Sequence, residues 1–272
     1  AARVYYPLYR SFEAKEVVIF GVTHGTVRKE IGDPQNIILL DEFKEWRGPI
    51  KNIQISSLRE FIKTHLDTSC FKVNNKAHEL EHSIEGQLPF LQYYNPEIKI
   101  TPIMVTAMPF ERIDQISGKL AVIISDYIKQ NNLVLGKDIV FLISSDANHY
   151  GKDFNNIPFG EDSAAHRKAT EQDRQIANDY LSDIVRLEKI KKFTDEMKNV
   201  IWCGKFSIPF GLLTTDKVVK SVLNSDLTGE ILRYSDTYSE GVLPVKGTQM
   251  GITAPFSLKH WCGFLSAAFY IE

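Results

Sequence analysis

Residues 16–22, with the sequence EVVIFGV, decide how the rest of the chain is interpreted. The run combines β-branched and aromatic side chains and is interrupted by a glycine, which is typical of a short buried strand. Residues 138–145, DIVFLISS, have the same character and predict a second buried strand. Residues 98–105, IKITPIMV, predict a third, although Pro102 lacks a backbone N–H and favours an edge or a bulge. Buried strands of this kind favour a sheet that is covered by helices.

Helical patterns lie between these strands. Ser56 or Ser57 is a candidate N-cap, with Glu60 placed for a capping box. The predicted helices begin near Ser56 and cover 110–130, 163–180, 182–193 and 208–223, and further strands are predicted at 229–238 and 263–271, joined by a Gly- and Pro-rich connection at 241–255. The alternation predicts an α/β fold with a central, largely parallel or mixed sheet flanked by helices. Because no repeat or low-complexity linker divides the chain, one domain over residues 1–272 is favoured.

Composition excludes several classes of function. The chain has 272 residues, 43% of them hydrophobic, which is enough to bury a substantial core. Lys and Arg total 32 against 34 Asp and Glu, so the basic footprint of a nucleic-acid-binding protein is missing. No apolar run approaches the roughly 20 residues of a membrane-spanning helix. Three cysteines are too few for a disulfide scaffold, which favours a reducing, cytoplasmic location.

Histidines and an aspartate follow two of the predicted strands. His24 comes just after residues 16–22, and Asp146 and His149 come just after the strand at 138–145. Ligands of open α/β sheets gather beyond the carboxyl ends of strands, so these side chains are candidates for a shared site. Imidazole is the commonest metal-ligating side chain and also transfers protons near neutral pH. The alternative is that the histidines are ordinary surface or core residues.

A third histidine lies in the sequence ELEHSIEGQLPF, residues 79–90. If a helix starts near His82, then His82 and Glu85 share one of its faces. A histidine that ligates a metal needs a partner on its other ring nitrogen, and Glu81, Glu85 and Asp146 are candidate carboxylates for that purpose.

Cys203 is the candidate thiolate. It lies in NVIWCGKFSIPFG, residues 199–211, just before a predicted helix whose first position would be Pro209. The N-terminus of that helix would lower the pKa of the thiol. The alternative is a buried cysteine in an apolar loop, and Cys70 and Cys262 are expected to be ordinary packing residues.

Four blocks in this order resemble the Memo family, whose members are also called AmmeMemoRadiSam system protein B. They are GVTH at 21–24, EHSIEGQLP at 81–89, SSDANHYG at 144–151, and CG at 203–204 with the following Pro209 and Gly211. The resemblance implies a fold like that of class III extradiol dioxygenases, with a cysteine replacing the carboxylate ligand of their iron site. It assigns His24, His82 and Cys203 as metal ligands and His149, with Asp146 beside it, as the catalytic pair.

Two departures from the family pattern accompany this resemblance. The family usually has Pro-Ser-His-His at the first ligand, whereas this chain has a glycine, Gly25, after His24. The family's Pro-His-Ala-Gly-Tyr block is expected before Ala1.

Three functions follow as hypotheses. The first is a mononuclear His/His/Cys site for redox chemistry, holding Fe(II), with Cu or Zn as alternatives, because thiolate is a soft ligand. The second, narrower, is extradiol cleavage of a catechol-like substrate, against which Cys203 counts because a thiolate can itself be oxidised. The third is a binding module whose pocket holds a small molecule or a peptide, by analogy with the phosphopeptide recognition linked to animal Memo proteins.

Overall fold

Strand β1 (Glu16–Val22) lies inside the larger of two sheets in the computed structural model, which describes residues 4–5, 14–240 and 257–271. It pairs in parallel with β6 (Lys99–Val105) on one side and with β7 (Ile139–Ile143) on the other. The other strands of this sheet are β2 (Ile38–Leu40), β3 (Glu45–Trp46), β4 (Ile53–Ile55) and β5 (Phe71–Val73). Strand β4 is parallel to β6, whereas β2 is antiparallel to it, so the sheet is mixed. The predicted α/β class, with a central mixed sheet, is confirmed.

The expectation that Pro102 places its strand at an edge is wrong. Strand β6 lies inside the sheet, between β1 and β4. On the side away from β1, β4 pairs with Lys99 and Ile100, and β2 pairs with Met104 and Val105. Pro102 falls between these two registers, so its missing N–H is tolerated in an interior strand.

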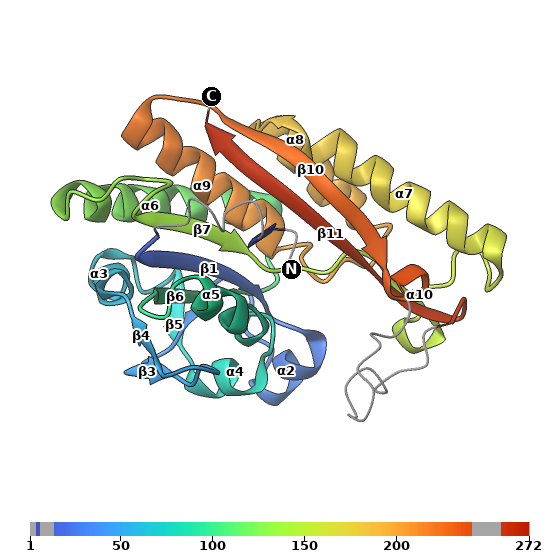
Figure 1. The fold of residues 1–272 in the computed structure, drawn as a ribbon, viewed down its shortest axis with the longest axis horizontal. Helices are drawn as coiled ribbons and strands as arrows, with labels where there is room; N and C mark the ends of the chain where they lie inside the picture. The colour runs from blue at the N-terminus through green and yellow to red at the C-terminus, as the bar shows by residue number, and fades with distance from the viewer. Residues whose placement is uncertain (1–3, 6–13, 241–256, 272) are drawn as a thin grey trace.

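Helices cover both faces of this sheet (Figure 1). The helices of this half are α2 (Gly25–Glu30), α3 (Ser57–His65), α4 (Asn75–Leu80), the 3-10 turn η1 (Glu85–Gln87), α5 (Leu88–Tyr94), α6 (Phe110–Gln130) and α9 (Ser207–Leu223). Alternate residues of β1 point to opposite faces, because the side-chain period of a strand is two. Val18 and Phe20 join the core under α6 and α9, whereas Val17 and Ile19 join the core under α4 and α5.

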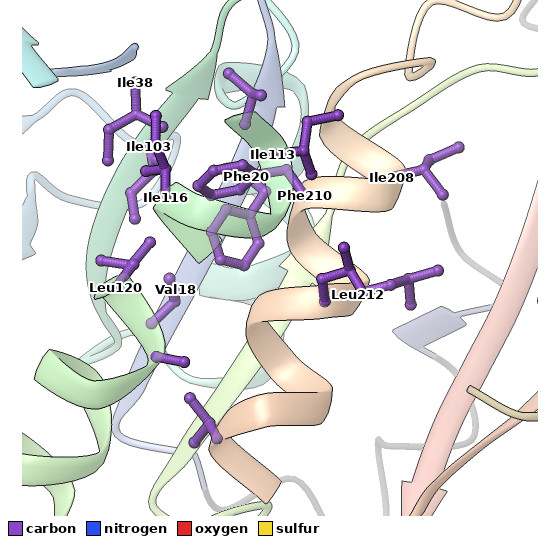
Figure 2. Close-up of a cluster of buried hydrophobic side chains, with 14 of the residues drawn as sticks. Val18, Phe20, Ile38, Ile103, Ile113, Ile116, Leu120, Ile208, Phe210 and Leu212 are labelled. Atoms are coloured by element: carbon purple, nitrogen blue, oxygen red, sulfur yellow. The ribbon is translucent and has the colours of Figure 1, made fainter. Parts of the chain in front are cut away.

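Aromatic packing fixes α9 against β1 (Figure 2). The rings of Phe20 and Phe210 meet edge to face with their centroids 5.7 Å apart, and both side chains are fully buried. Burying such a side chain contributes about 1.5–3 kcal/mol. The α9 N-terminus, and the loop that precedes it, are thereby held at the carboxyl end of β1.

The second sheet is antiparallel and has the strand order β8-β11-β10-β9. Its strands are β8 (His149–Gly151), β9 (Asp183–Ile184), β10 (Leu227–Asp236) and β11 (His260–Ile271), and its helices are η2 (Lys152–Phe154), α7 (Ser163–Leu181), α8 (Leu187–Glu196) and α10 (Thr237–Glu240). Helix α7 packs along β10 and β11 (Figure 1). The strands predicted at 229–238 and 263–271 are confirmed as β10 and β11, with shifted ends.

Two local predictions differ from the structure. The helix predicted over 182–193 begins only at Leu187, because Asp183 adopts a positive φ of 61° and pairs with β10 as part of β9. Ser56 is the N-cap of α3 and accepts a hydrogen bond from the Leu58 N–H, but Glu60 lies four residues later and pairs with Arg59 instead of closing a capping box. The connection predicted at 241–255 lies outside the described residues.

The chain passes from the first sheet to the second just after β7. Residues 144–148 leave β7, and β8 then pairs with β11, with His149 opposite Cys262. This crossing brings the carboxyl end of the parallel strands against the antiparallel sheet. Within the described residues, every helix is too short or too polar to cross a membrane.

Candidate metal centre

Cys203 lies in the loop before α9 and contacts the segment that follows β7. Its Sγ accepts a hydrogen bond from the backbone N–H of Asp146, with a distance of 3.0 Å. The next residue, Gly204, allows this approach, because a Cβ there would overlap Ser145. Helix α9 begins at Ser207, so Pro209 is its third residue and not its first. Cys203 therefore stands one turn before the helix, against the carboxyl end of β7.

His24 is fixed by a buried carboxylate. It is the N-cap residue of α2, two residues after the end of β1, and its backbone N–H donates to Glu81 Oε2 at 2.9 Å. Its ring Nδ1 lies 2.8 Å from Glu81 Oε1. This contact assigns the proton to Nδ1 when the ring is neutral, and Nε2 is then available as a ligand atom. Of the three carboxylates that the sequence offers as partners, Glu81 is thus the one that contacts His24.

Glu81 also holds its own chain segment in place. Its Oε1 accepts hydrogen bonds from the backbone N–H groups of His82 at 2.9 Å and Ser83 at 3.1 Å. Burial raises the pKa of Glu81, but its hydrogen bonds and the charge of His24 lower the pKa by more. The net pKa is lowered, so the carboxylate form is favoured. Gly21 allows the segment to pack against β1, since a Cβ there would approach Ser83 Oγ to 2.9 Å.

His82 stacks on His24. The two ring centroids are 4.8 Å apart and the ring planes differ by 9°. The His82 side chain is 77% exposed. The sequence allowed a helix that starts near His82, with His82 and Glu85 on one face. That prediction is wrong, because α4 ends at Leu80 and η1 begins at Glu85, which leaves His82 in an irregular segment.

A second group of candidate ligands surrounds Cys203. The ligand atoms of Asp146, His149 and Cys203 all lie within 4.8 Å of one another. His149 Nε2 is buried, has no hydrogen-bond partner, and lies 3.6 Å from Asp146 Oδ2. The His149 ring also packs against Phe154, with centroids 4.9 Å apart. A buried imidazole nitrogen and a sulfur at this separation are candidate metal-donor atoms.

Burial lowers the pKa of both imidazoles, but their neighbours outweigh it. The adjacent Cys203 sulfur and the Glu81 carboxylate raise the pKa of His24 to about 10. Asp146 and Cys203 raise the pKa of His149 to about 9. Burial raises the pKa of the Cys203 thiol, whereas His149 and His24 lower it, with a lowered pKa as the result. The two imidazoles and the Asp146 N–H therefore stabilise the thiolate, and a contribution from the helix N-terminus stays a prediction.

The predicted site residues thus fall into two neighbouring groups. One contains His24, Glu81 and His82, and the other contains Asp146, His149 and Cys203. The interaction between His24 and Cys203 joins them. The assignment of His24, His82 and Cys203 as one ligand set stays a prediction. Glu81 was identified from the sequence as a candidate partner, but its four hydrogen bonds were not.

A mainly apolar cavity adjoins this centre. Its volume is about 720 Å³, and Asp146, Ser145 and Trp202 contribute to its lining. Most of the remaining lining side chains come from β7, α9, β10 and β11. The cavity therefore extends between the two sheets, next to the candidate ligands.

Comparisons with known proteins identify the family. A sequence profile described as "Memo-like protein" matches residues 1–241. The chain belongs to the Memo-like family, as its four sequence blocks indicate. A MEMO1 family protein of Saccharolobus islandicus is 29% identical over 239 residues, which are 84% of this chain and 72% of that protein. A MEMO1 family protein of Pyrococcus horikoshii is 31% identical over 165 residues, which are 58% of this chain and 50% of that protein.

Among solved structures, the crystal structure of an uncharacterised Escherichia coli K12 protein is similar with a TM-score of 0.46 and 13% sequence identity. The comparison covers 96% of this chain and 91% of the other.

Proposed function

We propose that this protein binds one transition-metal ion at Cys203 and His24 and uses it in redox chemistry on a small molecule. The observation that carries the proposal is a cysteine with a lowered pKa beside two imidazoles, one of them held by a buried carboxylate. A thiolate, an imidazole nitrogen with its other nitrogen bound to a carboxylate, and a second imidazole form a donor set that fits Fe(II), Cu or Zn. We propose Fe(II) first, with Cu and Zn as alternatives.

Two histidines compete for the third ligand position. The family resemblance favours His82, which stacks on His24 and shares its contact with Glu81. The geometry favours His149, whose ligand atom lies within 4.8 Å of that of Cys203. If His82 is the ligand, then His149 stays free to hold a proton beside the metal, with Asp146 to orient it.

When bound, the metal would supply a centre that exchanges electrons and polarises a substrate oxygen. The residues of the chain perform the remaining tasks. Glu81 fixes the tautomer and orientation of His24. Asp146, whose Oδ2 lies 3.6 Å from His149 Nε2, raises the pKa of His149 and would help its ring to hold a proton. The Asp146 N–H donates to the thiolate and stabilises its charge.

Metal analysis after anaerobic purification tests this proposal. We expect the wild type to contain one equivalent of metal, and Cys203→Ser and His24→Ala to lose it. Comparison of His82→Ala with His149→Ala identifies the third ligand. His65→Ala is the matched control, because this exposed histidine on α3 contacts none of these groups. Equal metal content in the wild type and all four site variants would refute the proposal.

A second candidate, extradiol cleavage of a catechol-like substrate, is supported by the mainly apolar cavity beside Asp146, which is large enough for a small aromatic molecule. We expect a ring-opened product from at least one catechol under Fe(II) and O₂ if this candidate is correct. Its absence across a panel of catechols, with metal bound, would exclude ring cleavage while leaving the metal centre in place.

A further inference from the structure

Helix α7 contributes a fully buried carboxylate close to the candidate metal centre. Asp173 has no exposed surface. Its Oδ1 accepts a hydrogen bond from Trp202 Nε1 at 2.8 Å, and its Oδ2 accepts one from the Tyr234 hydroxyl at 2.6 Å. The backbone N–H of Asn148 also interacts with the carboxyl group. Asp173 thus connects three segments that are distant in the sequence.

Two of these segments carry the candidate ligands. Trp202 directly precedes Cys203, and Asn148 directly precedes His149. These two loops also pair with each other, through a bridge between Asn148 and Trp202 and through the His149 N–H, which donates to the Ile201 carbonyl at 2.9 Å. The Asp173 carboxyl group therefore contacts both partners of the bridge that holds Cys203 beside His149.

Strand β11 completes the arrangement. The Gly263 N–H donates to the Asn148 carbonyl at 2.7 Å, and the Ala147 N–H donates to the Gly263 carbonyl at 2.9 Å. A Cβ at Gly263 would lie 2.9 Å from Asp173 Oδ2 and 2.7 Å from the Tyr234 hydroxyl. Only glycine leaves room for the loop, the carboxyl group and the hydroxyl to meet here.

The three donors to Asp173 are an indole N–H, a phenolic hydroxyl and a backbone N–H, all of them neutral. Burying a carboxyl group without a cationic hydrogen-bond partner is unfavourable, and it is tolerated where the group satisfies several donors at once. Two of the three donors belong to the loops of Cys203 and His149. These donors compensate for the burial of the Asp173 carboxyl group at the point where the two loops meet.

We propose that Asp173 is a positioning residue of the candidate metal centre, which fixes Trp202 and Asn148 so that Cys203 and His149 stay side by side. Only the Co(II)-binding test of this inference rests on the proposed function, because the hydrogen-exchange test needs no metal. Without the carboxyl group, the indole N–H and the Asn148 N–H lose their acceptor, and the two loops are free to separate.

Co(II) binding to Asp173→Ala and Asp173→Asn tests the inference through the thiolate-to-Co(II) absorption band. Loss of a group that hydrogen-bonds directly to a metal ligand typically lowers metal affinity by about 10–100-fold. Asp173 acts through the neighbouring Trp202 and Asn148, so we expect the lower end, about tenfold, for Asp173→Ala together with a weaker thiolate band. We expect Asp173→Asn to restore most of the affinity, because its amide oxygen still accepts from Trp202. Wild-type affinity and band intensity in Asp173→Ala would overturn the inference.

Two further variants separate positioning from general destabilisation. Asp41 is equally buried and also accepts an indole N–H, from Trp46 at 2.7 Å, although it pairs with Arg59 as well. It contacts neither loop, so Asp41→Ala is the control for the loss of a buried carboxylate, with unchanged Co(II) affinity expected. Trp202→Phe removes only the indole donor. We expect it to lower the affinity by less than Asp173→Ala does, because the Asn148 contact with the carboxyl group remains, and we expect the double variant to bind no more weakly than Asp173→Ala. Full affinity in Trp202→Phe would overturn the inference even if Asp173→Ala does not fold. If both aspartate variants fold, equal losses in Asp41→Ala and Asp173→Ala would also overturn it.

Hydrogen exchange provides a readout that is independent of metal. We expect amides of residues 147–149 to exchange at least about tenfold faster in Asp173→Ala or Trp202→Phe, while α6 exchanges as in the wild type. A wild type that takes up no Co(II) would refute the proposed function, and the exchange result would then decide the positioning role alone. Unchanged exchange at residues 147–149 would overturn it.

Discussion

Replacing Asp173 by Asn should flatten the pH dependence of folding between pH 5.0 and 7.5. Burial raises the pKa of Asp173 from 3.8 to about 6, against the opposing effect of the hydrogen bonds from Tyr234, Trp202 and Asn148. A raised pKa means that the native state binds the proton more tightly than the unfolded chain does. The stabilisation by this proton is therefore complete below pH 3.8 and is lost as the pH rises through about 6.

The size of the effect follows from these two pKa values. Between pH 7.5 and pH 5.0, protonation of Asp173 adds about 1.4 kcal/mol to the free energy of unfolding, which is close to tenfold in the folding equilibrium. Asn carries no titrating proton, so Asp173→Asn loses this contribution. Every other titrating group is shared by the two proteins, and the difference between their pH profiles isolates Asp173.

Urea denaturation of chelator-treated wild type and Asp173→Asn at both pH values measures this difference. Tyr234→Phe provides a check on the sign, because the Tyr234 hydroxyl lowers the pKa of Asp173. Its removal should raise that pKa and steepen the pH dependence. Parallel profiles for wild type and Asp173→Asn, within about 0.3 kcal/mol of extrapolation error, would refute burial as the dominant influence on Asp173.

Three more predictions concern the candidate metal centre. Gly204→Ala should lower the free energy of unfolding by about 1–3 kcal/mol in urea titrations, since the added methyl group overlaps Ser145, and an unchanged midpoint would contradict the close approach. Glu81→Ala should cost about 1–3 kcal/mol for each buried donor left without an acceptor, and should also reduce metal content; Glu85→Ala, an exposed neighbour, is its control. His24→Ala should raise the pKa of the Cys203 thiol, because His24 lowers that pKa in the wild type. The pKa is measured by thiolate absorbance in a chain with Cys70 and Cys262 replaced by Ser, and an unchanged or lower pKa would show that the two side chains do not interact.

The sequence predicts the sheet well where hydrophobic pattern and strand length agree. Residues 16–22 form β1 with the predicted bounds, and 110–130 form α6. Pro102 misleads because the effect of a proline depends on which neighbours pair with it, and β2 and β4, which pair with β6 on the side away from β1, leave Pro102 unpaired there. The start of α8 was also misplaced, since the positive φ of Asp183 depends on pairing with a distant strand.

The candidate site was predictable in its residue types but not in its geometry. His24, Asp146, His149 and Cys203 lie at strand or helix ends, where functional groups gather, and the structure brings them together. His82 sits in a segment whose shape is set by the hydrogen bonds of Glu81, and no periodicity reveals such a shape. Asp173 was not identified, because it lies in a predominantly polar helix, where an aspartate is normally exposed.

The pairing of β11 with the loop of His149 has a consequence for the order in which the protein matures. Gly263 is far removed in sequence from residues 147–148, and contacts of such separation form late because closing a long loop costs entropy. During synthesis, the loops of Cys203 and His149 emerge before β11 exists to hold them. The bridge between these two loops therefore lacks the support of β11 until that strand has been made and has paired.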